Sequence, residues 1–155
     1  MHVDDGEIDL LARRGSHVVH CPTNHLKLAK GFAPVPDLLA AGVNVAMGVD
    51  MMADMLIEMR TEIGMHAAHR LDPAAVSRLD AFRMATRNGG RAVGWGDRIG
   101  LLEPGHLADI VLLDARSLLQ APLVDPAHAL LQEAEDVARA YMGRLGLAPG
   151  PWFTR

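Results

Sequence analysis

The sequence predicts an α/β fold organised around one parallel strand–helix–strand crossover. Two short apolar runs, 18–19 and 43–47, are each followed by a residue that can take part in chemistry, His20 and Asp50. A loop with proline and glycine and a short amphipathic helix separate these runs, as a crossover between parallel strands requires. Because sites in α/β folds lie at the carboxyl ends of strands, we expect function to centre on residues 18–50.

The chain is expected to begin with a helix, before any strand. Asp4 and Asp5 suit the first turn of this helix, and Gly15 ends it. Residues 16–20 then form a strand that stops before Pro22. Since an α/β chain normally starts with a strand, this order indicates an entry in the middle of a fold.

The middle of the crossover is expected to be a loop and a short helix. Residues 23–33 are predicted to form the loop, with Lys27 and Lys30 in solvent, and residues 37–41 the helix. The following run, 43–47, is almost continuously apolar, which is typical of a strand covered on both faces.

Helical spacing dominates the chain after the crossover. An apolar stripe with a spacing of four residues predicts a helix; it consists of Met55, Met59, Ile63 and Ala67. Asp72 before Pro73 is expected to cap a second helix. The remaining expected elements are, in chain order, a short helix around 91–93, a turn at 99–105, a strand at 108–114 and a helix beginning at 125.

Composition narrows the class of protein. The chain has 155 residues, half of them hydrophobic, which fits one globular domain with a real core. A net charge of −4 and an aromatic content of 4% provide neither a basic surface nor stacking platforms, so no nucleic-acid partner is expected. No apolar run approaches the roughly 20 residues of a membrane helix. The single cysteine and the absence of a signal-like N-terminus indicate a cytoplasmic protein.

Asp50 and His20 each have a chemical and a structural interpretation. Asp50 follows a strand end, where a carboxylate can bind a metal ion and carry a proton from bound water; it could equally cap the next helix. His20 could be a ligand, a general acid or base, or a hydrogen-bond donor to substrate. For an isolated histidine, a satisfied structural role is the more common one.

The other chemically capable residues favour structural roles on spacing alone. His66 and His69 share a helix face, yet no third ligand lies in a recognised pattern with them, which favours a solvated or packed pair. The methionines of residues 47–65 are better explained as core residues than as a soft-metal site. Cys21 is expected to be a buried, inert thiol.

Several motifs in order resemble the metal-dependent amidohydrolase superfamily, in the branch of chlorohydrolases and of guanine and adenosine-type ring deaminases. They are the segments VVHCP, LKLAKGFAPV, GVD, ADMLIEMR, RMATRNGG and IGLLEPGHLADIVLLD. The similarity covers roughly residues 4–130. It implies the C-terminal part of a (β/α)8 barrel, namely the last two barrel strands and their helices, with a remnant of the accompanying β-sandwich. The implied domains are a partial barrel at 1–98, a sandwich remnant at 99–124, and a helix and tail at 125–155.

The resemblance also implies a function. Asp50 falls on the aspartate that binds the metal, usually zinc and sometimes iron, and that moves the proton of the attacking water. His20 falls on a histidine near the substrate. The complete enzyme would hydrolyse C–N bonds other than peptide bonds, by deamination or dechlorination of a small nitrogen heterocycle.

The family's other metal ligands have no counterpart in this chain. The paired histidines of the first barrel strand, the histidine of a middle strand and that of the following strand are all missing. One carboxylate cannot hold a catalytic zinc, which needs about three protein ligands. We therefore expect a fragment that is inactive alone and that self-associates or pairs with the missing barrel half. The alternative is a non-catalytic α/β interaction module that retains the scaffold.

Overall fold

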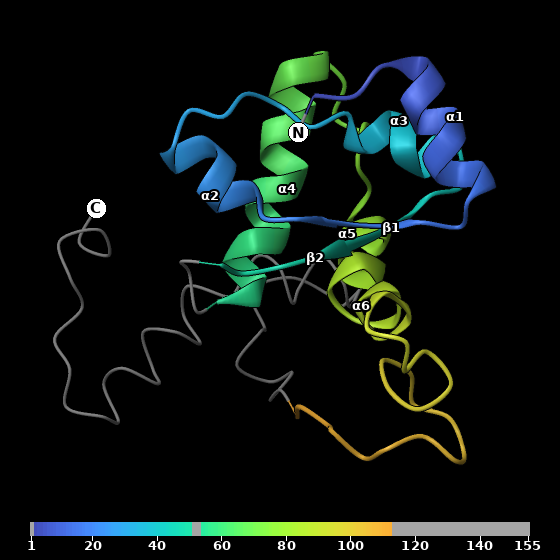
Figure 1. The fold of residues 1–155 in the computed structure, drawn as a ribbon. Helices are drawn as coiled ribbons and strands as arrows, with labels where there is room; N and C mark the ends of the chain where they lie inside the picture. The colour runs from blue at the N-terminus through green and yellow to red at the C-terminus, as the bar shows by residue number, and fades with distance from the viewer. Residues whose placement is uncertain (1, 51–53, 113–155) are drawn as a thin grey trace, which may run out of the picture. The chain divides into compact units, whose positions relative to one another are not determined.

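The computed structural model describes residues 2–50 and 54–112 (Figure 1). The chain divides into two units, residues 1–111 and 112–155, and all helices and strands named below belong to the first. They are α1 (Asp5–Arg13), β1 (His17–His20), α2 (Pro22–Lys27), α3 (Val35–Ala40), β2 (Asn44–Met47), α4 (Met55–Arg70), α5 (Arg78–Ala85) and α6 (Arg87–Ala92).

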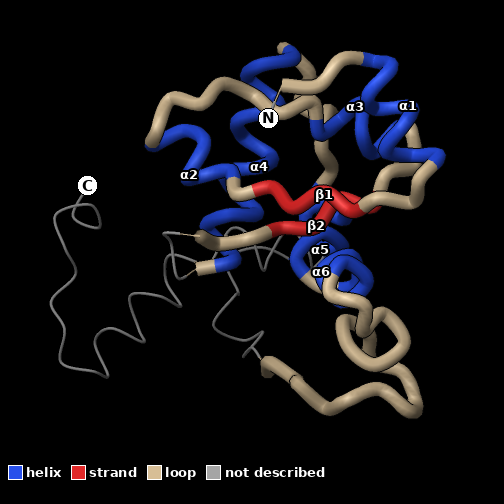
Figure 2. The backbone as a smooth tube through the Cα atoms, viewed as in Figure 1, coloured by secondary structure: helices blue, strands red, loops and turns tan. Residues whose placement is uncertain are grey.

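The two strands confirm the predicted parallel crossover. β1 and β2 pair in parallel, with His17 opposite Asn44 and His20 opposite Met47. The helices α2 and α3 lie in the connection between the two strands (Figure 2). The carboxyl ends of β1 and β2 therefore lie side by side, and the chain segments that follow them leave the sheet at the same edge.

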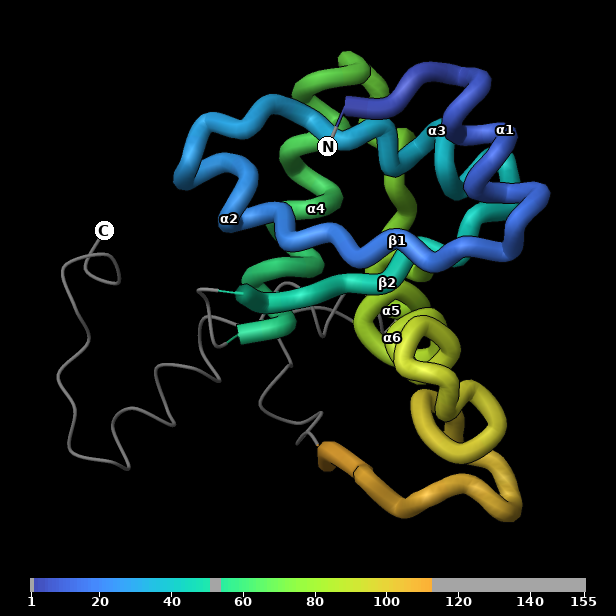
Figure 3. The backbone as a smooth tube through the Cα atoms, viewed as in Figure 1, coloured from blue at the N-terminus to red at the C-terminus, as the bar shows by residue number. Residues whose placement is uncertain are grey.

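The two strands differ in how they are covered. Val45, Ala46 and Met47 of β2 are all buried, which confirms the prediction of a strand covered on both faces. Helices α3, α5 and α6 pack against β2, and α6 also contacts β1 (Figure 3). β1 instead alternates: Val18 is buried, whereas Val19 is 58% exposed on the opposite face. One face of β1 is thus open in the described part of the chain.

The first helix forms as predicted. The side chain of Asp4 accepts a hydrogen bond from the Glu7 N–H at 2.9 Å, and the Glu7 carboxylate accepts from the Asp4 N–H at 2.9 Å. This reciprocal capping satisfies two backbone donors that a helix start leaves open. Ile8 is the buried residue that attaches α1 to the core.

The prediction of a loop from residue 23 was wrong in its first part, because α2 occupies residues 22–27. Pro22 lies at the first helical position, where its fixed φ angle suits a helix and its missing N–H costs nothing. The Thr23 N–H donates to the buried carboxylate of Glu58 on α4 at 3.0 Å. A long-range contact therefore stabilises the start of α2, and the residues near α2 in the sequence could not predict that contact.

The prediction that Asp72 caps the next helix was also wrong. Its side chain accepts from the Ala74 N–H at 2.8 Å within a turn, and α5 begins only at Arg78. Ser77 is the actual cap, with its hydroxyl accepting from the Asp80 N–H at 3.1 Å. Leu71, with a φ of 54°, ends α4 and turns the chain toward this second start.

The C-terminal predictions are only partly covered by the described residues. Residues 99–105 form bends and turns, as expected, whereas 108–112 form no strand. Residues 113–114 and the helix expected from 125 lie outside the described residues, as does the second part of the expected sandwich remnant, residues 113–124. Within the described ranges, no helix combines the length and the apolar character that spanning a membrane would need.

Candidate functional site

Two groups of polar side chains begin at the carboxyl ends of the two strands. The first, which we call the buried cluster, consists of His20 after β1 and of Glu62 and His66 on α4. The second, which we call the loop array, consists of Asp50 after β2 with Asn24 and Lys30 from the crossover connection. The sequence pointed to one member of each group.

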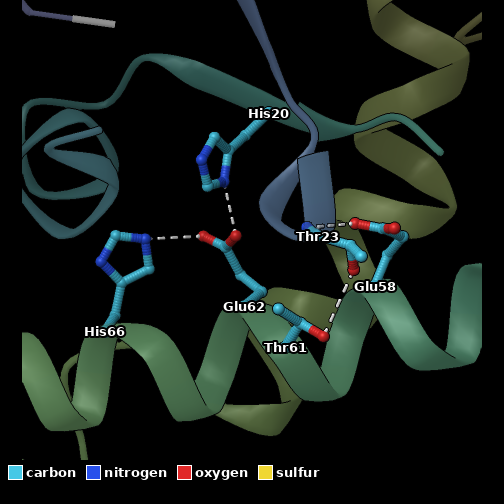
Figure 4. A network of polar contacts seen from close by, with 6 residues as sticks. All are labelled: His20, Thr23, Glu58, Thr61, Glu62 and His66. Carbon is cyan, nitrogen blue, oxygen red and sulfur yellow. Dashed lines mark hydrogen bonds and ion pairs between the residues drawn. The ribbon is translucent and has the colours of Figure 1, made fainter. Parts of the chain in front are cut away.

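The buried cluster is a carboxylate held between two imidazoles. His20 Nδ1 lies 2.5 Å from Glu62 Oε2, and His66 Nε2 lies 3.2 Å from Glu62 Oε1. Figure 4 shows the Glu62 carboxylate between the two rings, with His20 coming from the strand and His66 from the same helix. The side chain of His20 is 2% exposed, and those of Glu62 and His66 are fully covered. The group is therefore shielded from bulk water.

Helical spacing places the acidic and histidine side chains of α4 on its covered face. Glu58, Glu62 and His66 follow one another at intervals of four residues and are all buried, beside Met59 and Met65. The expected apolar stripe is therefore offset, since only Met59 among its four residues is fully buried. The alternation of β1 turns His20 to the same side as buried Val18. The cluster is therefore formed by one side chain from β1 and two from α4.

The electrostatics of the cluster favour an ionised Glu62. Burial by itself raises the pKa of this carboxyl group, but its contacts with the rings of His20 and His66 outweigh burial and lower the pKa below its ordinary value. His25 lies edge-on to His20, with ring centroids 4.7 Å apart. Burial, then the nearby charge of His20, lowers the pKa of His25, which favours its neutral form.

The loop array has the opposite surroundings. Asp50 is exposed and has a φ of 44°, in the left-handed region that aspartate tolerates better than most residues. The buried amide of Asn24 donates to Asp50 Oδ2, and Lys30 Nζ donates to Asn24 Oδ1 at 2.8 Å. Lys30 is exposed, as expected, and its ammonium group also makes this bond. The bond orients the Asn24 amide toward Asp50.

The structure excludes a capping role for Asp50. The cap of α4 is Asp54, whose side chain accepts from the N–H groups of Leu56 at 2.8 Å and Ile57 at 3.3 Å. Asp50 therefore follows β2 without serving α4, and its carboxylate faces the crossover connection through Asn24. The expected roles of Asp50 as metal ligand and proton carrier and of His20 beside the substrate stay predictions.

His66 and His69 do not act as the packed or solvated pair that their spacing suggested. His66 is fully buried against Glu62, whereas His69 is exposed and stacks on Phe32, with ring centroids 4.1 Å apart. Sequence reasoning missed Glu62 altogether. The available signal was the run of Glu58, Glu62 and His66 at helical spacing, which places ionisable groups on one face together with methionines.

The surroundings of the Cys21 thiol agree with its expected inertness, but the residue is only partly covered and not buried as expected. Burial raises its pKa, and the charges of Asp50 and Glu58 raise it further, so little thiolate forms near neutral pH. Cys21 is a free cysteine of intermediate exposure.

Comparison with known proteins places the chain in a family. The model of the amidohydrolase family matches residues 1–141. The 5-methylthioadenosine/S-adenosylhomocysteine deaminase of Syntrophobacter fumaroxidans is 44% identical over 151 residues, which is 92% of this chain and 34% of that protein. The 5'-deoxyadenosine deaminase of Methanopyrus kandleri is 40% identical over 131 residues, covering 81% of this chain and 29% of that protein. The chain thus spans about a third of the length of these curated relatives.

Solved structures agree with this result. An adenosine deaminase from Xanthomonas campestris, determined with bound zinc, superimposes with a TM-score of 0.79 at 40% identity, over 84% of this chain and 31% of that one. The guanine deaminase of E. coli superimposes with a TM-score of 0.70 at 25% identity, over 86% of this chain and 33% of that one. The order of motifs, the parallel crossover and these matches lead to one conclusion: the chain belongs to the amidohydrolase family, in its deaminase branch.

Proposed function

We propose that this chain provides the last two barrel strands of a metal-dependent hydrolase that removes the amino group from the ring of an adenosine derivative. The observation that carries the proposal is the position of Asp50, which is exposed beyond the carboxyl end of β2 and is not used as a helix cap. The curated relatives are named for deamination of adenosine derivatives, which supports this substrate class. The proposed division remains a partial barrel at 1–98, a sandwich remnant at 99–124 and a C-terminal helix and tail.

Asp50 is proposed to bind the metal and to accept the proton of the attacking water. The bond from Asn24 occupies one carboxylate oxygen, Oδ2, and thereby fixes the plane of the group. Lys30 holds the amide oxygen of Asn24, so the amide cannot turn that oxygen toward Asp50 without losing a charge-assisted bond. The three residues together orient the carboxylate and leave its other oxygen, Oδ1, for a ligand.

The described residues do not complete a metal site around Asp50. In the described ranges, the group of three ligand side chains close enough to share an ion is the buried cluster, which does not include Asp50. A catalytic zinc ion needs about three protein ligands. The metal chemistry of the proposed enzyme therefore requires residues other than those described, and zinc is proposed because the Xanthomonas structure holds it.

A substrate-side role for His20 stays a prediction. Its ring is 2% exposed, and Nδ1 is bound to Glu62, so only Nε2 is left for a substrate. A polar contact with substrate would require that atom to become accessible.

A chimera tests the proposal. This chain would replace the matching segment of the Xanthomonas campestris adenosine deaminase, and ammonia release from adenosine and 5'-methylthioadenosine would be measured. We expect an active chimera, and we expect Asp50→Asn to lower kcat by roughly 10²–10⁴-fold, since it removes the proton-accepting group. Asp54→Asn is the matched control, because asparagine also caps helices. A folded, zinc-loaded chimera without activity would favour the non-catalytic module instead.

A further inference from the structure

The buried cluster has the composition of a metal site. One ligand atom each from His20, Glu62 and His66 can be chosen so that all lie within 4.8 Å of one another. Two imidazole nitrogens and a carboxylate oxygen form a ligand set that zinc uses in proteins, usually with a fourth ligand from water. The set is drawn from a strand and a helix that meet through these side chains, so it does not depend on a loop.

Hydrogen bonding within the cluster leaves several of its polar atoms unsatisfied. His20 Nε2 and both ring nitrogens of His66 are buried without a hydrogen-bond partner, and so is Glu62 Oε1, which meets His66 only at ion-pair distance. Buried polar atoms are nearly always satisfied in proteins, because leaving one unpaired costs about 1–3 kcal/mol. Two of these atoms, His66 Nε2 and Glu62 Oε1, lie 3.2 Å apart without a hydrogen bond between them. This arrangement points to a missing partner that both atoms could bind, and the charge of Glu62 makes that partner a cation.

A water molecule would complete the coordination of the ion. The His25 ring lies edge-on to His20, and its Nδ1 is buried without a hydrogen-bond partner, but His25 is not among the ligand side chains close enough to share one ion. The carboxylate of Glu58 lies on the same helix face one turn before Glu62, but one of its oxygens accepts a hydrogen bond from the Thr23 N–H.

We propose that His20, Glu62 and His66 bind one zinc ion, or a similar divalent transition metal, in the layer between β1 and α4. Binding would release the proton shared between His20 Nδ1 and the Glu62 carboxylate, because a metal ligand must present a free lone pair. The ion would tie the end of β1 to the middle of α4 and stabilise the described unit. This inference does not rest on the proposed function, since Asp50 takes no part in it.

Metal titration of the full 155-residue chain tests this site. After chelation and dialysis, Co²⁺ and Zn²⁺ would be added and followed by the visible absorption of cobalt and by calorimetry. We expect one equivalent to bind, with the intense absorption of four-coordinate cobalt, and Zn²⁺ to displace Co²⁺. Absence of binding, or six-coordinate cobalt with weak absorption, would overturn the proposal.

Variants locate the ion. Glu62→Gln and His66→Gln keep side-chain size roughly constant and are expected to weaken binding by more than the 10–100-fold typical of losing an outer-shell partner. His69→Gln is the matched control, because it removes an exposed histidine from the same helix. Asp50→Asn separates the two proposals: unchanged affinity supports the buried cluster, whereas loss of binding in this variant places the ion at Asp50.

A measurement on the unaltered chain covers the case in which a variant does not fold. Nitrogen NMR of ¹⁵N-histidine-labelled protein reports directly on imidazole nitrogens that bind metal. One equivalent of zinc is expected to shift the ring nitrogens of two histidines and to leave unchanged the signals of His69, which the His69→Gln spectrum identifies. Shifts confined to exposed histidines would contradict the site.

Discussion

The buried cluster and the loop array begin at neighbouring strand ends, yet they have opposite environments. His20 is paired in register with Met47, and Asp50 lies three residues further along the chain. The pleat of β1 turns His20 toward α4, where it is 2% exposed, while Asp50 lies in solvent at a left-handed turn. Position at a strand end therefore identifies a candidate residue, but the direction of its side chain decides which chemistry is available to it.

The difference also separates stability from reactivity. Charges in a shielded site interact strongly with one another, and leaving one of them unpaired is costly. The buried cluster therefore contributes to the stability of the folded core. Charges in solvent contribute little to stability and remain free to meet a ligand. We expect substitutions in the first group to affect folding and those in the second to affect function.

Alanine substitutions of the two carboxylates give the largest expected contrast. Glu62→Ala leaves His20 without its hydrogen-bond partner and His66 without its ion-pair partner, and it is expected to lower the free energy of unfolding by about 3–5 kcal/mol. Asp50→Ala removes an exposed group and should lower it by no more than about 1 kcal/mol. Urea unfolding followed by circular dichroism, with a chelator present, measures both. Equal losses would show that the two environments do not differ energetically.

The glycine between the two groups should be nearly as sensitive. A β-carbon at Gly48 would lie 2.9 Å from Cys21 Sγ and 3.0 Å from Val19 Cγ1, closer than van der Waals contact allows. Gly48→Ala is therefore expected to cost about 1–3 kcal/mol, since it overpacks the strand end. Gly64 on α4 has nothing within 4 Å of such a carbon, so Gly64→Ala should instead stabilise by about 0.4–1 kcal/mol. Thermal unfolding of the two variants should give shifts of opposite sign.

The sequence predicted the parts of the fold that depend on local signals. The strands β1 and β2, the crossover and α1 follow from apolar runs, glycine stops and acidic first turns, and the structure confirms them. The strand expected at 108–114 does not form in its described part, 108–112. One error occurs where a distant residue decides the outcome, and another where two local caps compete for the same helix. Glu58 stabilises the start of α2 from 35 positions away, and Ser77 rather than Asp72 begins α5.

The candidate site was predictable only in part for the same reason. Asp50 and His20 could be located because strand ends are visible in the apolar pattern. Their partners could not, because Glu62 is 42 positions from His20 and sits on a helix whose register relative to β1 is set by packing. The motif ADMLIEMR indicated α4. The apolar stripe of that helix, however, predicted that a different face would be buried from the one that carries Glu58 and Glu62.

Acid unfolding distinguishes the two groups by the behaviour of Glu62. Its folded-state pKa is lowered from an ordinary value of 4.5, so its contribution to stability is present above that value and is lost as pH falls through the lowered pKa. In metal-free protein, the free energy of unfolding should therefore fall more steeply below about pH 4.5 than it does in Glu62→Gln. Urea titrations across the acid range compare the slopes. Parallel curves for the two proteins would mean that Glu62 is not held ionised by the rings.

The reactivity of Cys21 offers the mildest test, because this thiol senses the charge of Asp50 in the loop array and that of Glu58 on α4. Burial raises its pKa above the ordinary 9.0, and the charges of Asp50 and then Glu58 add to the rise. We expect iodoacetamide to alkylate the folded chain more slowly than the unfolded chain at pH 8. Asp50→Asn should restore a few-fold of that rate by removing one negative charge, since thiolate is the reacting form. If Asp50→Asn leaves the rate unchanged, solvent screens Asp50 from Cys21 completely, and the loop array is electrostatically independent of the core beside it.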